Sequence, residues 1–357
     1  MFTYPNIGVY MPTPIDPQTA RWLSALFSEE SEVALVPRLE AERKISRQAA
    51  AAQVRRWVQA GFLQEVGNTR PKRHSLNTLV HNEWKLKLAG FDEHVAWTTT
   101  IRPAIEAYAS EAALKIWDYA ATEMLNNAKD HSDGSSIRVT IWITATDAAL
   151  SITDDGEGIF RRIARLCELP DERFALLELA KGKLTTDPSR HSGEGIFFTS
   201  RAVDHFQIQS GDLTFDHRDQ LMDVLVDNED SPVTGTRVLM SLCHETERKL
   251  RSVFDQFSSE DQEEGLSRFD KTIIPVRLAR LGTESVVSRS QAQRLLARVE
   301  RFRRVAFDFE GVDSIGQGFA DEIFRVFKNQ HPEVSIAVLN ANDDVTFMIK
   351  RVRGQGT

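Results

Sequence analysis

One predicted helix limits the folds open to this chain more than any other feature. The stretch EMLNNAKDHSDG, residues 123–134, ends that helix, and strand-like runs at 136–144 and 148–160 follow it. The polar residues that recur at helical spacing are Glu123, Asn126, Asn127, Asp130 and His131. Residues three, four, seven and eight positions apart lie on one side of a helix. This face is therefore either exposed surface or the wall of a site.

Two glycine motifs and a Gly-Thr pair decide between these readings. The second strand runs into DDGEG, and a second Gly-x-Gly opens a predicted helix in HSGEGIFF, residues 191–198. A turn at VTGT leads into a further strand, residues 231–242. Neither Gly-x-Gly continues as a dinucleotide G-x-G-x-x-G motif, and no G-x-x-x-x-G-K-[ST] loop occurs in the sequence. The sequence therefore disfavours Rossmann and P-loop folds.

The ordered set of motifs resembles the GHKL ATPase superfamily, which includes histidine kinases, anti-sigma-factor kinases and gyrase B. The resemblance spans roughly residues 91–245. The matching positions are Glu123 and Asn127 of Glu-x-x-x-Asn, Asp154, Gly156 and Gly158 of Asp-x-Gly-x-Gly, Gly193 and Gly195 of the second Gly-x-Gly, and Gly235 and Thr236. The superfamily fold is the Bergerat α/β sandwich, and its cofactors are ATP and Mg²⁺.

The chemistry of these residue types suits that resemblance. Asn127 offers a hard amide oxygen, suited to a Mg²⁺ ion on the ATP phosphates. Glu123, one turn earlier, is placed to orient or deprotonate the group that attacks the γ-phosphate. The resemblance implies that Asp154 accepts a hydrogen bond from the adenine amino group, with Thr236 supporting it through water.

Glycine positions fit the same interpretation. Gly156 and Gly158 let the backbone pass close to the base and sugar, where a Cβ would clash. Gly193 and Gly195 free backbone N–H groups at a helix N-terminus for phosphate oxygens.

The segment between the two glycine motifs, residues 160–191, matches the lid of such ATPases in position. Lys181, Lys183 and Thr185 are candidate phosphate contacts there. A charged lid surface without a ligand is the alternative reading of these side chains.

The N-terminal part is basic although the whole chain has a net charge of −8. Between Arg38 and Arg73 the sequence has nine Arg or Lys and three Glu. Predicted helices at 17–27, 32–42 and 45–62 precede two strand-like runs, an order that resembles a winged helix-turn-helix domain. The candidate DNA contacts are Arg47, Gln48, Gln53 and Arg56 on the third helix and Arg70, Lys72 and Arg73 on the wing. The alternatives are a solvated basic face or a protein-binding domain.

The C-terminal part alternates strands and helices, which predicts a small α/β layer. FDFEGVDSIGQGFADEIF, residues 307–324, resembles a STAS-like domain, whose relatives include anti-anti-sigma factors. Those relatives carry a phosphorylated Ser at the position of Gln317, whereas Ser314 lies three residues earlier. The resemblance implies a protein-interaction module, and a structural cap is the alternative.

These inferences predict a multidomain α+β protein. The expected parts are a winged helix at 1–90, a GHKL domain at 91–250, a linker at 251–267 and a STAS-like domain at 268–357. The apolar runs are too short for a membrane helix and no signal peptide is visible, so a cytoplasmic protein is expected. The two cysteines fit that setting. The oligomeric state stays open, with a homodimer among the alternatives.

Two functions remain open at this point. In the first, Mg-ATP binding and hydrolysis drive a regulator, of transcription if the N-terminal domain binds DNA. In the second, the central domain is a Ser/Thr protein kinase of the anti-sigma-factor type. Autophosphorylation on histidine is disfavoured because His94 lies in no heptad-patterned helix. A domain that only binds ATP is disfavoured by the presence of both Glu123 and Asn127.

Overall fold

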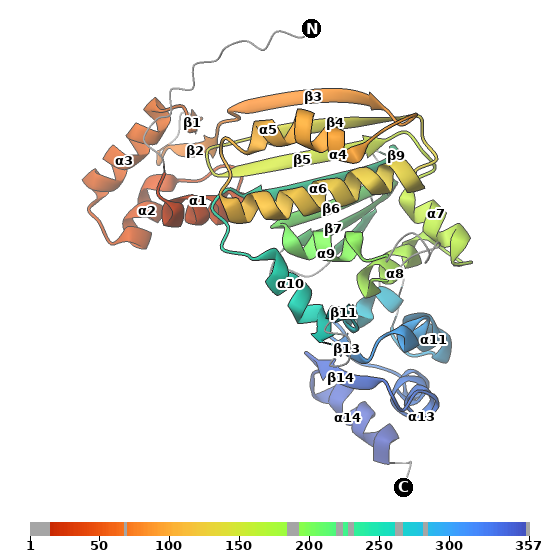
Figure 1. Ribbon diagram of the computed structural model, residues 1–357. Helices are drawn as coiled ribbons and strands as arrows, with labels where there is room; N and C mark the ends of the chain where they lie inside the picture. The colour runs from red at the N-terminus through yellow and green to blue at the C-terminus, as the bar shows by residue number, and fades with distance from the viewer. Residues whose placement is uncertain are drawn as a thin grey trace.

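Three units follow one another along the chain (Figure 1). The computed structural model describes residues 15–67, 70–183, 193–218, 224–227, 232–260, 267–280 and 285–354. The N-terminal unit lies at one end of a large sheet, at the left of Figure 1. The C-terminal unit lies at the bottom of the same view, below α8, α9 and α10. Among the described helices, none is both long and apolar enough to cross a membrane.

The N-terminal unit consists of three helices and a hairpin. Its elements are α1 (Pro17–Glu29), α2 (Leu35–Arg43), α3 (Arg47–Gln59), β1 (Leu63–Val66) and β2 (Arg73–Leu76). Asp16 and Ser46 cap α1 and α3 because their side chains accept backbone N–H groups of the first turn. Val33 pairs with His74, so a short bridge adds a third chain segment to the hairpin.

Polar contacts join α1 to the central unit. Ser24 donates a hydrogen bond to Asp147, at the start of β5. Arg21 pairs with Glu247 at 2.8 Å, just beyond the last central strand.

A seven-stranded antiparallel sheet forms the central unit, in the order β3-β4-β5-β9-β6-β7-β8. The strands are β3 (Val80–Lys87), β4 (Ser136–Ile143), β5 (Asp147–Asp154), β6 (His205–Gly211), β7 (Leu213–Arg218), β8 (Val224–Asp227) and β9 (Val233–Cys243). Helices cover one face (Figure 1). They are α4 (Glu93–Ala96), η1 (Trp97–Ile101), α5 (Arg102–Ile105), α6 (Glu111–His131), α7 (Ile159–Leu166), η2 (Glu172–Phe174), α8 (Ala175–Lys181) and α9 (Gly195–Ala202). Helix α10 (Leu250–Phe257) follows the sheet and packs against α9 and the core of the C-terminal unit.

Helix α6 provides much of the core of this unit. Ile116, Trp117 and Met124 on its apolar face are buried in one cluster with Ile141 and Leu150 of the sheet. The polar residues of the same helix are therefore held at fixed positions relative to the sheet, because the opposite face is packed.

The C-terminal unit has a parallel sheet in the order β12-β13-β14 with helices around it. Its elements are β10 (Ser258–Glu260), β11 (Ser267–Phe269), β12 (Lys271–Pro275), η3 (Val276–Ala279), α11 (Arg289–Leu296), η4 (Val299–Arg301), β13 (Arg304–Asp308), α12 (Gln317–Asp321), η5 (Glu322–Phe327), α13 (Lys328–Gln330), β14 (Ser335–Leu339) and α14 (Asp343–Arg353). The predicted small α/β layer is confirmed. Gln317 is the first residue of α12, and Ser314 lies in the exposed loop before it.

Two boundaries differ from those expected. Strand β3 lies within residues 1–90 but pairs with β4 along its whole length, so it belongs to the central sheet. Helix α10 lies within the expected linker at 251–267, and its Val253 and Phe257 are buried. Both boundary differences have the same cause. Strand pairing and burial in the folded chain determine to which unit a short segment belongs.

Candidate functional site

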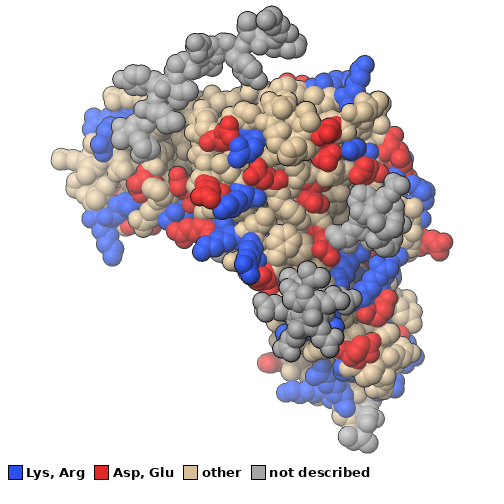
Figure 2. Space-filling model, viewed as in Figure 1, with Lys and Arg blue, Asp and Glu red and all other residues tan. Residues whose placement is uncertain are grey.

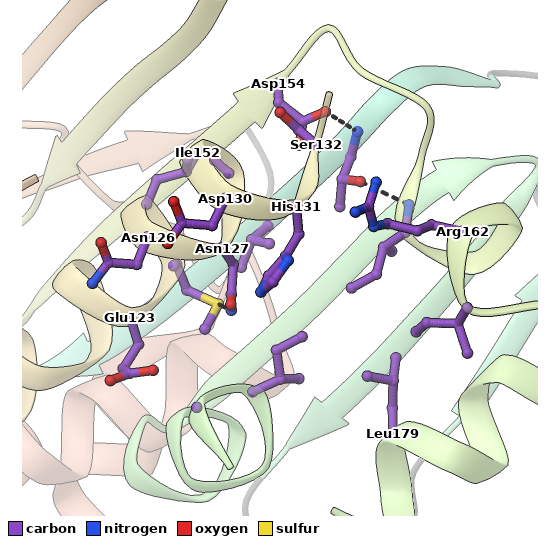
Figure 3. Close-up of a pocket in the computed structure, with 18 of the residues that line it drawn as sticks. Glu123, Asn126, Asn127, Asp130, His131, Ser132, Ile152, Asp154, Arg162 and Leu179 are labelled. Carbon is purple, nitrogen blue, oxygen red and sulfur yellow. Dashed lines mark hydrogen bonds between the residues drawn. The ribbon is translucent and has the colours of Figure 1, made fainter. Parts of the chain in front are cut away.

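The polar end of α6 forms one wall of a cavity of about 440 Å³. Such a volume is within the usual range for a small-molecule site. The cavity brings together Glu123, Asn126, Asn127, Asp130, His131, Asp154, Gly193, Gly195 and Thr236. Figure 3 shows the α6 side chains on one side and Asp154 at the end of its strand above them. The predicted polar face is thus the wall of a site and not free surface.

Asp154 ends strand β5 and is held by the backbone. Its Oδ1 accepts hydrogen bonds from the N–H groups of Gly156, at 2.9 Å, and Thr236, at 3.1 Å. Burial raises the pKa of this carboxyl, and the two N–H donors act in the opposite direction. The Thr236 hydroxyl in turn accepts the N–H of Ile159 at 2.9 Å. The two oxygens of Asp154 are therefore fixed in orientation beside the cavity.

The neighbouring carboxylate, Asp155, is held by hydrogen bonds to the start of β4. It accepts hydrogen bonds from the backbone and hydroxyl groups of Ser135 and Ser136, at the start of β4. The N–H of Ser136 and the hydroxyl of Ser135 are the largest causes that hold the pKa of Asp155 far below its usual range. Of the two adjacent acids, only Asp154 lines the cavity.

Two glycines allow a close approach of neighbouring groups, and Gly156 is required because the group it approaches is backbone. A Cβ on Gly156 would lie 1.9 Å from the carbonyl oxygen of Ser132, because the end of α6 packs directly on the turn after β5. A Cβ on Gly195 would lie 2.1 Å from Oε2 of Glu123. The second glycine motif therefore allows α9 to begin against the carboxylate of Glu123.

Acidic groups gather around that contact. Burial raises the pKa of Glu194, with Lys183 lowering it and Glu123 raising it further. Burial, followed by Glu123 and Glu194, also raises the pKa of Tyr119. Negative charge at this point is thus already crowded before any phosphate is present, so a cation that accompanies a phosphate ligand would relieve the repulsion.

Asn127 fits the role of an oxygen ligand for Mg²⁺. Its amide nitrogen contacts the sulfur of Met124 at 3.8 Å, which leaves the amide oxygen for the cavity. Among the described residues, no group of three or more His, Cys, Asp or Glu could hold a metal ion. Mg²⁺ sites on nucleotides commonly combine one or two protein oxygen ligands with phosphate oxygens and water.

The structure does not bring Lys183 to the cavity. Its ammonium donates to the carbonyl of Arg301 at 3.0 Å and lies 4.6 Å from the ring centre of Phe302, both in the C-terminal unit. This position gives no support to a phosphate contact. Lys181 is buried in the same region, and Thr185 lies outside the described residues.

Several residues that line the cavity were not predicted from the sequence. Arg162 of α7 lines the cavity (Figure 3). Its guanidinium donates a hydrogen bond to Asp133, which follows α6. The apolar walls come from Ile152, Ile159, Ile163, Leu166, Leu179 and Val238. Helical spacing after Gly158 would have linked Ile159, Arg162 and Ile163, but the pattern alone does not show that this face turns toward α6.

The candidate DNA contacts lie on the surface of the N-terminal unit. Arg47, Gln48, Arg56, Arg70, Lys72 and Arg73 are exposed, and Gln53 is half-buried. Lys72 pairs with Glu65. Arg73 pairs with Glu32 at 3.7 Å and Glu30 at 3.8 Å. Figure 2 shows Asp and Glu side chains among the Lys and Arg of this unit, so part of the basic charge is balanced locally.

Comparison with known protein families gives two matches. Residues 93–214 match the family described as histidine kinase-like ATPase domain. The central unit is a histidine kinase-like ATPase domain. Residues 291–346 match a STAS-like domain of unknown function. No curated protein matches the chain. The first match supports an ATP-binding function of the ATPase or kinase type, with ATP and typically Mg²⁺ as cofactors.

Proposed function

We propose that the protein is an ATP-dependent regulator in which Glu123 activates the group that attacks the γ-phosphate. The observation that carries this proposal is the shared cavity of Glu123, Asn127, Asp154 and the Gly193–Gly195 motif. The adenine would lie near Asp154, and the triphosphate near α9. Bound Mg²⁺ would supply positive charge against the phosphates and the crowded carboxylates.

The coupling part of this proposal rests on helices α8 and α9, which lie between the cavity and the C-terminal unit. On α8, Leu179 lines the cavity, whereas Leu177 is buried in the core of the C-terminal unit. On α9, Gly195 lines the cavity, and Phe197 and Phe198 enter the same C-terminal core. A displacement of either helix on nucleotide binding would therefore change the packing of both the central and the C-terminal unit.

Buried charges strengthen that junction. The side chain of Lys181 is 2% exposed, and its ammonium donates to Glu178 at 2.8 Å and to the carbonyls of Arg294 and Ala297, each at 3.0 Å. Arg298 donates to Glu178 at 2.9 Å from the C-terminal unit. Buried ion pairs of this kind hold a defined geometry because each partner left alone would be costly.

Transfer of label from γ-labelled ATP tests the proposed chemistry. We expect purified protein with Mg²⁺ to release free labelled phosphate, at a slow rate. Label retained on the protein, or passed to a partner, would instead support a kinase of the anti-sigma-factor type. No release and no transfer would refute both.

We further propose that the N-terminal unit is a winged helix that binds DNA through α3 and the hairpin. Three helices, a two-stranded hairpin and the Val33–His74 bridge support this fold, and the exposed Arg47 and Arg56 support the DNA contact. A gel shift with random duplex at two salt concentrations tests it. Binding should weaken steeply as salt rises, because phosphate contacts release counterions. Binding that does not change with salt, or no binding at low salt, would contradict it.

A further inference from the structure

A second cavity, of about 730 Å³, lies in the C-terminal unit. It is formed by the start of α11, one face of the helix that runs through α12, η5 and α13, and the last turn of α14. None of its lining residues lines the nucleotide cavity. Helix α11 runs from this cavity to the end of α8, since Arg289 opens the helix and the Lys181 ammonium contacts the carbonyls at its other end.

Positive charge dominates the wall of this cavity. Arg289, Arg325 and Arg353 contribute three guanidinium groups to the lining, which contains a single carboxylate, Asp321. Figure 2 shows Lys and Arg side chains gathered near this end of the molecule, where the last turn of α14 is basic. The lining therefore has a formal excess of positive charge.

The single carboxylate is already fully engaged. Asp321 accepts two hydrogen bonds from Arg325, one of them at 2.7 Å, and a further one from Arg289 at 3.1 Å. The hydrogen bond from Arg325 is the largest cause that lowers the pKa of Asp321. Asp321 thus orients two guanidinium groups and has little capacity left to accept other donors.

Donors remain in excess. A guanidinium has five N–H groups, and within the described residues Arg325 uses only its Nε and one terminal nitrogen, and Arg289 only one nitrogen. Arg353 lies 5.1 Å from the ring centre of Phe324, which steadies its plane. Gln317 and Asn329 add side-chain amides to the lining. The side chains of Arg289 and Arg325 are 63% and 42% exposed, so their remaining N–H groups are accessible to a ligand. An anionic ligand rich in acceptor oxygens would complement this wall.

We propose that this cavity binds a phosphate ester through Arg289, Arg325 and Arg353. A phosphate monoester presents three acceptor oxygens and nearly two negative charges, which match planar guanidinium donors. The cavity is larger than one phosphate group needs, so the ester carries an organic part. That part is either a small metabolite or a phosphorylated side chain of a partner protein, and the two share the same recognition chemistry.

Isothermal titration calorimetry on the full-length protein tests the proposal, with three probes. Inorganic phosphate tests the group itself, ribose 5-phosphate the small-molecule source, and a phosphoserine peptide the protein source. We expect inorganic phosphate to bind weakly and at least one of the two esters to bind more tightly. Preference between the two esters identifies the source.

Single variants localise the binding. Arg289→Gln and Arg353→Gln should each weaken the preferred ester at least about tenfold, the effect of losing one charge-assisted hydrogen bond. Arg351→Gln is the matched control, because Arg351 is exposed on the same helix outside the cavity and its loss changes the charge equally. Its affinity should stay within about twofold.

Three results would overturn the assignment. They are no binding of any phosphorylated probe, an equal loss in Arg351→Gln, and equal affinity for the peptide with Glu in place of phosphoserine. The first would leave the arginines without a ligand of this class. The second and third would show a general attraction to negative charge.

Discussion

The cavity at the end of α6 and the junction of α8 with the C-terminal unit around Lys181 are built in opposite ways. Residues at recognisable spacings, on one helix and in two glycine turns, line much of the cavity. In the junction, a charged side chain from the predicted lid is buried against a unit more than a hundred residues later, as the contact of Lys181 with Ala297 shows. Local spacing in the sequence therefore predicts much of the cavity, whereas the junction arises only from long-range packing.

The largest expected effects concern ATP turnover and ATP binding in the cavity at the end of α6. Glu123→Ala should lower ATP turnover by about 10²–10⁴-fold, the usual contribution of a general base, while binding persists. Asp154→Asn should abolish detectable ATP binding instead, because an amide can present an N–H where the adenine amino group needs an acceptor. Label release and calorimetry measure the two effects separately.

The control for these variants is Glu111→Ala, which removes an exposed acid from the first turn of the same helix. It should leave turnover unchanged. Turnover by Glu123→Ala at the normal rate would show that another group acts as the base.

A second prediction concerns the junction. Lys181→Met should lower the free energy of unfolding by about 3 kcal/mol. It removes one of the two cationic partners of buried Glu178, with only Arg298 remaining, and also removes the donor to the carbonyls of Arg294 and Ala297. The double variant Glu178→Leu with Lys181→Met should recover most of that loss, because both charges go together. Urea denaturation measures both changes.

The exposed pair of Lys115 and Glu111 is the matched control for that prediction, at 67% and 84% side-chain exposure. Lys115→Met should cost less than about 1 kcal/mol, as surface pairs do. An equally small effect of Lys181→Met would mean that the junction is open in solution.

The smallest expected effect tests whether acid weakens the central unit independently of the junction. Burial lowers the pKa of His244 from 6.5 to about 4. Between these values the unfolded chain binds a proton that the folded chain does not, so the free energy of unfolding falls as pH decreases from about 6.5 to about 4. The full contribution is about 3 kcal/mol, and only part of it is lost at pH 5.5.

Comparison of wild type with His244→Gln isolates the contribution of His244 to the pH dependence of the unfolding free energy, since the variant lacks the titrating ring. Its unfolding free energy should fall less between pH 7 and pH 4.5 than that of wild type, as measured by urea denaturation. His81→Gln, at an exposed position, is the control. Parallel curves for wild type and His244→Gln would exclude the buried imidazole as the cause.

Much of the candidate site could be placed from the sequence because its motifs are local. The distance from Glu123 to Asn127 is one helical turn whatever the rest of the chain does, and the DDGEG turn must follow its strand. Lys183 shows the limit of this reasoning. Its place between the two glycine motifs suggested a phosphate contact, yet its ammonium lies against Arg301 and Phe302.

The limits of the units were likewise beyond the sequence. The run at 80–87 has the alternating pattern of a strand, and that pattern fits either the N-terminal hairpin or the central sheet equally well. Pairing with β4 assigned it to the central sheet.

The sequence by itself determined the central ATPase-type domain, the polar residues of α6 that line its cavity, and the α/β character of the C-terminal unit. The tertiary structure decided which of Asp154 and Asp155 lines the cavity, and that α8 is buried against the C-terminal unit. It also decided that three arginines from separate elements share a second cavity. The physical reason is that spacing along a helix or turn is fixed by covalent geometry, whereas burial and charge pairing between distant segments depend on how the whole chain packs.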